Sequence, residues 1–357
     1  SNVAATIASL CNLAFARELR IICAVMIQLP MREYNIRSLC SEKTGAKVFM
    51  RNVLKKENTS DGTKIRPERG GTDVAKKRTR LDFVEMKKNG DKVAWVTAYD
   101  YPMATFAEAA EMDMILVGDS LGMVVLGYQG TIPVTMEDCI SHCKAVRRGA
   151  PNTFVVGDMP FMSYQISDED AVYNAGRFLK EADSDAVKLE GGRRVLSRIE
   201  AIANAGVLVM GHIGLTPQSS GQLGGFKAQG RDPDSARELI HDAIAIQKAG
   251  GFALLLEAVP PELTEYISKK LTIPVYSIGA GLPCDGQLLI CGDMLGLFQA
   301  FTPKFVKKYA NVAEIEVNAF KEYVQDVKTG KFPTDDHVYH ILKGKEEDFA
   351  HMLREFD

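Results

Sequence analysis

The sequence is dominated by short apolar runs that end in a polar or ionisable residue. Residues 114–117 (MILV) lead directly into Gly118 and Asp119. The pattern recurs in residues 154–158, 186–190, 207–212 and 252–257, which end in Asp158, Glu190, His212 and Glu257. A short apolar run bounded by turn residues is typical of a buried strand. These strands predict one site, assembled at the same end of one sheet.

Strand patterns alternate with helical patterns from about Arg78 onward. We predict strands at 93–100, 114–119, 153–158, 186–190, 207–212, 252–257, 273–279 and 287–291, and a closing helix at 303–328. Apolar strands without clean alternation are typical of a parallel sheet covered by helices. Eight strand–helix units close a (β/α)8 TIM barrel. An open doubly wound sheet usually has a glycine-rich turn after its first strand, whereas this strand ends in Ala98-Tyr-Asp100. We therefore predict the barrel.

The chain divides into three predicted parts. They are an N-terminal extension at 1–77, a catalytic barrel at 78–339 and a C-terminal tail at 340–357. The extension has more basic than acidic residues, and residues 57–73 are polar and glycine-rich, which favours a linker or a disordered segment. It is either a targeting segment, which would direct the protein to mitochondria, or an extension without a catalytic role. Otherwise we predict a cytoplasmic protein.

Charge and hydropathy exclude several kinds of partner. The net charge of −3 is too small to argue for nucleic acid or for an acidic partner. The most apolar N-terminal stretch, residues 21–29, is much shorter than the roughly 20 residues that span a bilayer. We expect small-molecule substrates and neither a nucleic acid nor a membrane as partner.

Three acidic residues end neighbouring strands of the predicted barrel. The carboxyl ends of barrel strands are the positions that reach substrate, so Asp119, Asp158 and Glu190 should converge. Converging carboxylates repel one another unless a cation neutralises them, and hard oxygen ligands suit Mg²⁺. A single aspartate at a strand end can instead cap a helix, so the prediction depends on the three together.

Three further residues have a predicted role. Lys188 lies two residues before Glu190 and so points to the same side of its strand; it would either pair with the carboxylates or bind an anionic substrate. Glu257 follows an apolar run, which should raise its pKa and suits a general base. His212 would be a structural residue or a hydrogen-bonding group for substrate. The glycine-rich loop 214–230 is long enough to be a lid.

Together these residues predict a Mg²⁺-dependent barrel that forms an enolate. A metal-bound 2-oxo acid has a more acidic carbon next to its carbonyl group, and a carboxylate can remove that proton. The enolate must then meet an electrophile, which these residues do not identify.

Several runs of the chain resemble one enzyme family. They are VTAYD at 96–100, LVGDSLG at 116–122, RRGAP at 147–151, KLEGG at 188–192, GHIGLTPQS at 211–219, LGGF at 223–226 and SIGAG at 277–281. In consistent order and spacing over residues 78–339, these runs are similar to those of the ketopantoate hydroxymethyltransferase (3-methyl-2-oxobutanoate hydroxymethyltransferase) family.

The resemblance implies a reaction of pantothenate and coenzyme A biosynthesis. A hydroxymethyl group would pass from 5,10-methylenetetrahydrofolate to 3-methyl-2-oxobutanoate, giving 2-dehydropantoate. By matching position, Asp119, Asp158 and Glu190 resemble the Mg²⁺ site, at which other divalent metals could also bind, and Glu257 the general base. Substrate contacts are implied for Asp119, Ser120, Asp158, Lys188 and His212. A homo-oligomer, often a decamer, is also implied.

Two other kinds of protein share part of this pattern. Another enolate-forming barrel, such as a 2-oxo-acid carbon–carbon lyase or a phosphonomutase, should carry a catalytic cysteine after a strand, but no cysteine lies between Cys143 and Cys284. A non-catalytic barrel scaffold should have lost one of Asp119, Asp158 and Glu257, and all three are present.

Overall fold

The computed structural model describes residues 77–357. The predicted extension at 1–77 therefore lies almost wholly outside the described residues, and the three-part division of the chain stays a prediction. Within residues 77–357, no helix combines the length and apolar character needed to cross a membrane.

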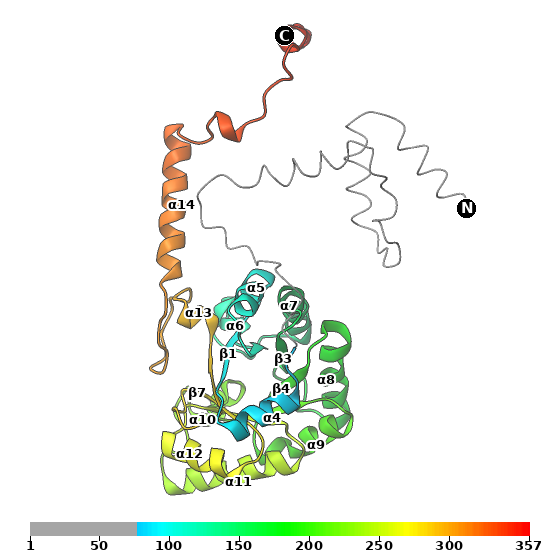
Figure 1. Cartoon of the computed structure of the whole chain (residues 1–357), viewed down its shortest axis with the longest axis vertical. Coiled ribbons are helices and arrows are strands. Elements are labelled where there is room, and N and C mark those ends of the chain that lie inside the picture. The colour runs from blue at the N-terminus through cyan, green and yellow to red at the C-terminus, as the bar shows by residue number, and fades with distance from the viewer. Residues whose placement is uncertain (1–76) are drawn as a thin grey trace, which may run out of the picture. The chain divides into compact units, whose positions relative to one another are not determined.

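Eight parallel strands form a closed barrel (Figure 1). They are β1 Val93–Thr97, β2 Met114–Val117, β3 Phe154–Asp158, β4 Ala186–Glu190, β5 Val209–Gly214, β6 Ala253–Glu257, β7 Val275–Ile278 and β8 Gly286–Leu289. Each strand pairs in parallel with the next one along the chain, and β8 pairs with β1. The predicted (β/α)8 barrel is confirmed.

Helices precede β1, join each pair of successive strands from β1 to β7 and follow β8, whereas no helix of the described residues lies between β7 and β8 (Figure 1). They are α4 Arg80–Asn89, α5 Tyr101–Ala109, α6 Leu121–Val124, α7 Met136–Gly149, α8 Asp168–Ala182, α9 Leu196–Asn204, α10 Ser220–Leu223, α11 Pro233–Lys248, α12 Pro261–Lys270, α13 Cys291–Met294, α14 Val312–Thr329 and α15 Glu346–Leu353. Their starts are set by local chemistry: Thr135 and Ser167, for example, accept hydrogen bonds from the first turns of α7 and α8.

Two hydrophobic clusters hold the barrel together. The larger one packs the outer faces of the strands against the helices. The smaller one contains Trp95, Met114 and Tyr276 from three strands. Phe83 of α4 joins this inner cluster and makes an edge contact with Phe154, with 5.1 Å between the ring centres. The interior is therefore a packed core, as in other barrels of this type.

The helix predicted at 303–328 is partly wrong. Helix α14 begins only at Val312, and residues 303–311 have no helical structure. Pro303 and Phe305 line a cavity instead. Apolar spacing in this segment reflects burial against the cavity as well as the face of a helix.

Candidate active site

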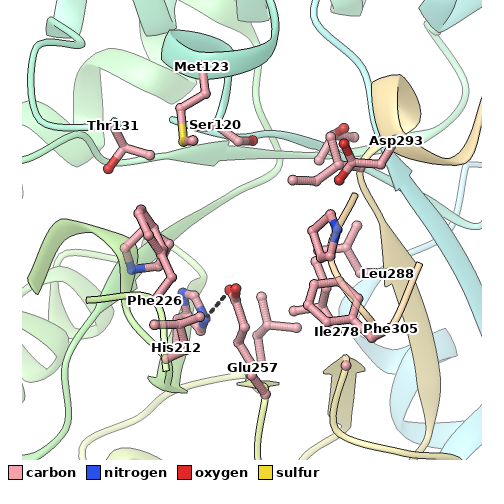
Figure 2. Close-up of a pocket in the computed structure, with 18 of the residues that line it drawn as sticks. Ser120, Met123, Thr131, His212, Phe226, Glu257, Ile278, Leu288, Asp293 and Phe305 are labelled. Atoms are coloured by element: carbon pink, nitrogen blue, oxygen red, sulfur yellow. Dashed lines mark ion pairs between the residues drawn. The ribbon is translucent and has the colours of Figure 1, made fainter. Parts of the chain in front are cut away.

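All seven residues predicted for the site line one cavity. It has a volume of about 1010 Å³. The walls include the metal, substrate and base candidates Asp119, Ser120, Asp158, Lys188, Glu190, His212 and Glu257. Asp158, Glu190 and Glu257 end their strands, and Asp119 and Ser120 follow β2 closely, as the sequence pattern predicted. Lys188 lies within β4. His212 also lies within its strand, because β5 continues to Gly214, so the prediction that His212 ends the fifth strand is wrong. Figure 2 shows Ser120 across the cavity from the His212–Glu257 pair.

Lys188 is held at the centre of the acidic residues. Its Nζ lies 2.8 Å from Oδ1 of Asp158 and 3.9 Å from Oε1 of Glu190. The second carboxylate oxygen of Asp158 accepts the backbone N–H of Asp119 at 3.0 Å. The register explains this cluster because Asp158 and Lys188 are directly paired across β3 and β4.

The cluster shifts the pKa of its members. Burial opposes a charge on Lys188, but the surrounding carboxylates outweigh it and raise the lysine pKa, so Nζ is an ammonium group. Burial, followed by repulsion from Asp158, raises the pKa of Asp119 well above its ordinary value. Burial also raises the pKa of Glu190 to about 7, although Lys188 works against this. The site therefore holds more carboxyl groups than one lysine can keep ionised.

His212 connects Lys188 to Glu257. Its Nδ1 lies 3.3 Å from Nζ of Lys188, and its Nε2 lies 3.2 Å from Oε2 of Glu257. Because an ammonium group has no lone pair, it must donate to Nδ1, which places the imidazole proton on Nε2, facing Glu257. Burial, assisted by Lys188, lowers the pKa of His212, so the imidazole is neutral.

Glu257 has the properties expected of a general base. Its side chain is 14% exposed, and burial raises its pKa, although the contact with His212 works in the opposite direction. A carboxyl group with a raised pKa takes up a proton more readily near neutral pH. The predicted environment of Glu257 is therefore present, and its catalytic role stays a prediction.

The backbone around Glu257 is tightly constrained. Gly214 has φ +96° on the neighbouring strand, and a Cβ there would lie 2.3 Å from the carbonyl oxygen of Glu257. Ala258 adopts the left-handed conformation with φ +48°, which is unfavourable for a residue with a side chain. Hydrogen bonds from its N–H to Ile278 and from the N–H of Gln229 to its carbonyl hold this sharp turn. The chain thus fixes the direction of the Glu257 side chain.

Gln218 is a site residue that the sequence reasoning missed. Its side-chain N–H donates to Oδ2 of Asp119 at 2.8 Å, and its backbone N–H donates to Oε2 of Glu190 at 2.9 Å. The hydroxyl of Tyr164 donates to the Gln218 side chain at 2.6 Å and accepts the backbone N–H of Glu190. Part of the loop predicted as a lid therefore holds two carboxylates in place.

Ser120 has a second hydroxyl beside it. Tyr99 is 4% exposed, and its hydroxyl lies 2.8 Å from Oγ of Ser120. Burial raises the pKa of Tyr99 well above its ordinary value, so the phenol keeps its proton. Tyr99 belongs to the VTAYD run, and its position just after β1 is the signal that could have identified it.

The acidic residues fit a divalent cation by chemistry and charge. Within residues 77–357, no three His, Cys, Asp or Glu side chains are arranged as a ready metal site. However, Oε1 of Glu190 is buried without a hydrogen-bond donor from the described part of the chain. An all-oxygen donor set of several carboxyl groups, which a cation would keep ionised, suits Mg²⁺. Asp119, Asp158 and Glu190 stay predicted as its ligands.

A closed parallel barrel with acids, a lysine and an imidazole at the ends of its strands has the architecture of a (β/α)8 enzyme. The sequence of the chain shows to which family of such enzymes it belongs. The family model described as ketopantoate hydroxymethyltransferase matches residues 77–335. The chain belongs to this family, as the resemblance predicted, and is a hydroxymethyltransferase.

Individual relatives agree with the family assignment. The chain is 74% identical over 283 residues to the 3-methyl-2-oxobutanoate hydroxymethyltransferase of Alkaliphilus metalliredigens, covering 79% of this chain and 100% of the relative. It is 56% identical over 254 residues to the enzyme of the same name from Moorella thermoacetica, covering 71% of this chain and 94% of that enzyme.

Among solved structures, a crystal structure of phosphonopyruvate hydrolase with oxalate and Mg²⁺ aligns with a TM-score of 0.49 and 12% identity, covering 77% of this chain and 96% of that one.

Proposed function

We propose that the enzyme transfers a hydroxymethyl group from 5,10-methylenetetrahydrofolate to 3-methyl-2-oxobutanoate, giving 2-dehydropantoate for pantothenate biosynthesis. One observation carries the proposal. A general-base candidate, Glu257, shares a cavity with the Lys188–Asp158 ion pair, and His212 lies between them. The identity of the oxo acid is taken from the names of the relatives, and the identity of the one-carbon donor from the family resemblance.

The first step is removal of the proton at C3 of the oxo acid. Glu257 takes this proton, and the electron pair left on carbon forms the C2–C3 double bond of an enolate. Lys188 binds the anionic acid, and Ser120 offers a hydroxyl group to it. A Mg²⁺ ion or another divalent cation held by Asp119, Asp158 and Glu190 would stabilise the negative charge on the C2 oxygen.

His212 holds the side chain of the general base, Glu257, in position between catalytic cycles. As a neutral imidazole with its proton on Nε2, it faces the Glu257 carboxylate without adding a positive charge. An imidazolium at this position would lower the pKa of Glu257 further and weaken the base. The charge of Lys188 helps to keep His212 neutral, although it also acts directly to lower the pKa of Glu257.

The second step needs an electrophile in the same cavity. Water adds to the one-carbon unit of the folate, and cleavage of its carbon–nitrogen bonds releases tetrahydrofolate and formaldehyde. The enolate carbon then attacks the carbonyl carbon of formaldehyde, and the resulting alkoxide takes up the proton held by Glu257 to become the new hydroxyl group. Ligand cavities commonly measure roughly 300–1,000 Å³. The cavity found here, about 1010 Å³, has room for both the five-carbon acid and a ring of the donor.

The proposal is tested by hydrogen exchange at C3 of 3-methyl-2-oxobutanoate in D2O, followed by NMR without folate. Exchange should depend on the enzyme and on Mg²⁺, and a chelator should abolish it. Addition of 5,10-methylenetetrahydrofolate should then convert the acid to 2-dehydropantoate. Absence of both exchange and product would refute the proposed reaction.

We also propose that the chain assembles into a homo-oligomer, for which the family resemblance suggests a decamer. None of the residues of α14 is buried. Phe320, Tyr323, Val324 and Val327 share one face of the helix by spacing, and all are exposed within the described chain, Phe320 to 67%. A second copy of the chain would cover this face.

Substitution of Phe320 tests the assembly. Phe320→Asp should shift the particle towards smaller species in light scattering, because a charge would be buried in the contact. Glu322→Gln, a neutral change on the same helix, is the matched control and should keep the size of the unmodified protein. An unchanged size for Phe320→Asp would exclude this face of α14 from the contact.

A further inference from the structure

One carboxylate lines the cavity on the side away from the His212–Glu257 pair. Asp293 lies in the short helix α13, which follows β8, and it is 4% exposed. In Figure 2 it lies on the side of the cavity where Ile278, Leu288 and Phe305 are drawn, away from the His212–Glu257 pair. The reaction steps described above do not use it.

No group in the described part of the chain donates a hydrogen bond to the Asp293 carboxylate. Within residues 77–357, no hydrogen bond or ion pair of its side chain is found, and its backbone N–H donates to the carbonyl of Ile290. The cation named among the influences on it, Lys308, only moderates the effect of burial, which raises the pKa of Asp293 to about 6. Asp293 is therefore mostly ionised at neutral pH. A buried carboxylate without donors is costly unless a ligand supplies them.

The walls near Asp293 select for a flat, apolar ligand. Phe298, Phe301 and Phe305 line the cavity together with the aliphatic side chains of Ile278, Leu288 and Ile290. Aromatic rings pack well against the faces of other rings. The oxo acid is an anion, so the charge of Asp293 repels it and leaves it to Lys188. The two ends of the cavity therefore differ in the groups that they offer, an ammonium at Lys188 and a carboxylate beside apolar rings at Asp293.

A carboxylate can accept two parallel hydrogen bonds from adjacent N–H groups. The pterin ring of a folate presents such a pair, its ring amide N–H and its 2-amino group. We propose that Asp293 is the specificity residue that binds this N–H pair of the one-carbon donor, while the neighbouring phenylalanines cover the ring. The inference rests on the proposed function, because it takes a folate as the donor.

The test compares two ligands and two variants of the full chain. Binding of 6-methylpterin and of its 2-desamino analogue is measured by ligand fluorescence or calorimetry. The unmodified enzyme should prefer 6-methylpterin roughly ten- to a hundredfold, since hydrogen bonds to charged groups are of that strength. Asp293→Asn keeps the shape of the side chain but cannot accept both bonds, so this preference should fall to about twofold or less.

A matched control separates recognition from structure. Asp285 lies directly before β8, the strand that α13 follows. It pairs with Lys87 at 2.6 Å and does not line the cavity. Asp285→Asn should therefore keep the preference for the 2-amino ring, even if it lowers stability. In turnover, Asp293→Asn should raise KM for 5,10-methylenetetrahydrofolate roughly ten- to a hundredfold, with a much smaller effect on KM for the oxo acid.

The outcomes distinguish this inference from the proposed function. If Asp293→Asn keeps the full preference for the 2-amino ring, or if the unmodified enzyme has none, Asp293 does not read the N–H pair, whatever the reaction. If the unmodified enzyme exchanges the C3 hydrogen but makes no product from 5,10-methylenetetrahydrofolate and binds no pterin, the folate donor itself is wrong, and the inference is overturned with it.

Discussion

Glu257→Gln should lower the Mg²⁺-dependent exchange of the C3 hydrogen by roughly 10²–10⁴-fold, the usual contribution of a general base. The amide has nearly the shape of the carboxylate and can keep its place beside Nε2 of His212, but it cannot take a proton. Binding of the oxo acid should change little, because Glu257 removes a proton and contributes little to holding the anion. The measurement is NMR exchange alongside calorimetric binding.

A control on the neighbouring helix makes this result specific. Glu262 lies in the first turn of α12 and is exposed, so Glu262→Gln should exchange at the rate of the unmodified enzyme. If Glu257→Gln also exchanges at that rate, another group removes the proton. A parallel loss of exchange and of oxo-acid binding would instead assign Glu257 to substrate binding.

The clustering of residues at the strand ends could be predicted because it depends on the local apolar pattern and on the parallel pairing of neighbouring strands. An apolar run identifies a buried strand, and the parallel order of a barrel then places the last residues of neighbouring strands together. The register confirms this closeness: Asp158 is paired with Lys188, and Glu190 with His212. The grouping of the predicted site residues therefore follows from the sequence and the fold class alone.

The contacts made by loops could not be predicted in this way. Tyr164 and Gln218 are separated by 54 residues and meet through one hydrogen bond. Neither lies in a periodic segment, and the glycines of residues 214–230 suggested mobility although Gln218 is 5% exposed. Such contacts depend on how two irregular segments fold against each other, which no local pattern records.

The apolar residues after β8 led to the partly wrong prediction of a helix at 303–328 for a related reason. An apolar residue can face a helix partner, a cavity or another copy of the chain, and its spacing does not distinguish these. Phe305 lines the cavity, whereas Phe320, in α14, is exposed within the described chain. The position of Asp293 was missed because its short helix has no repeating pattern.

Lys188→Met should lower the free energy of unfolding in EDTA by about 3–5 kcal/mol, because it removes one partner of a buried ion pair. Asp158 would lose its cation, and the pKa values of Asp119 and Glu190 would rise further. A carboxyl group with a raised folded-state pKa binds its proton more tightly in the folded protein, so it favours folding at low pH. That contribution is lost as the pH rises through the folded-state pKa. The deficit should therefore be larger at about pH 8 than at about pH 5.

Two further variants decide whether charge is the cause. Adding Asp158→Asn to Lys188→Met removes the uncompensated partner as well, so the double variant should recover part of the lost stability. Lys87→Met breaks the partly buried pair with Asp285, outside the cavity, and should cost less, with little change between the two pH values. Urea unfolding of all four proteins gives these numbers. The loss in free energy of unfolding in Lys188→Met could instead be independent of pH and unchanged in the double variant. Lys188 would then stabilise the barrel by packing and not through its charge.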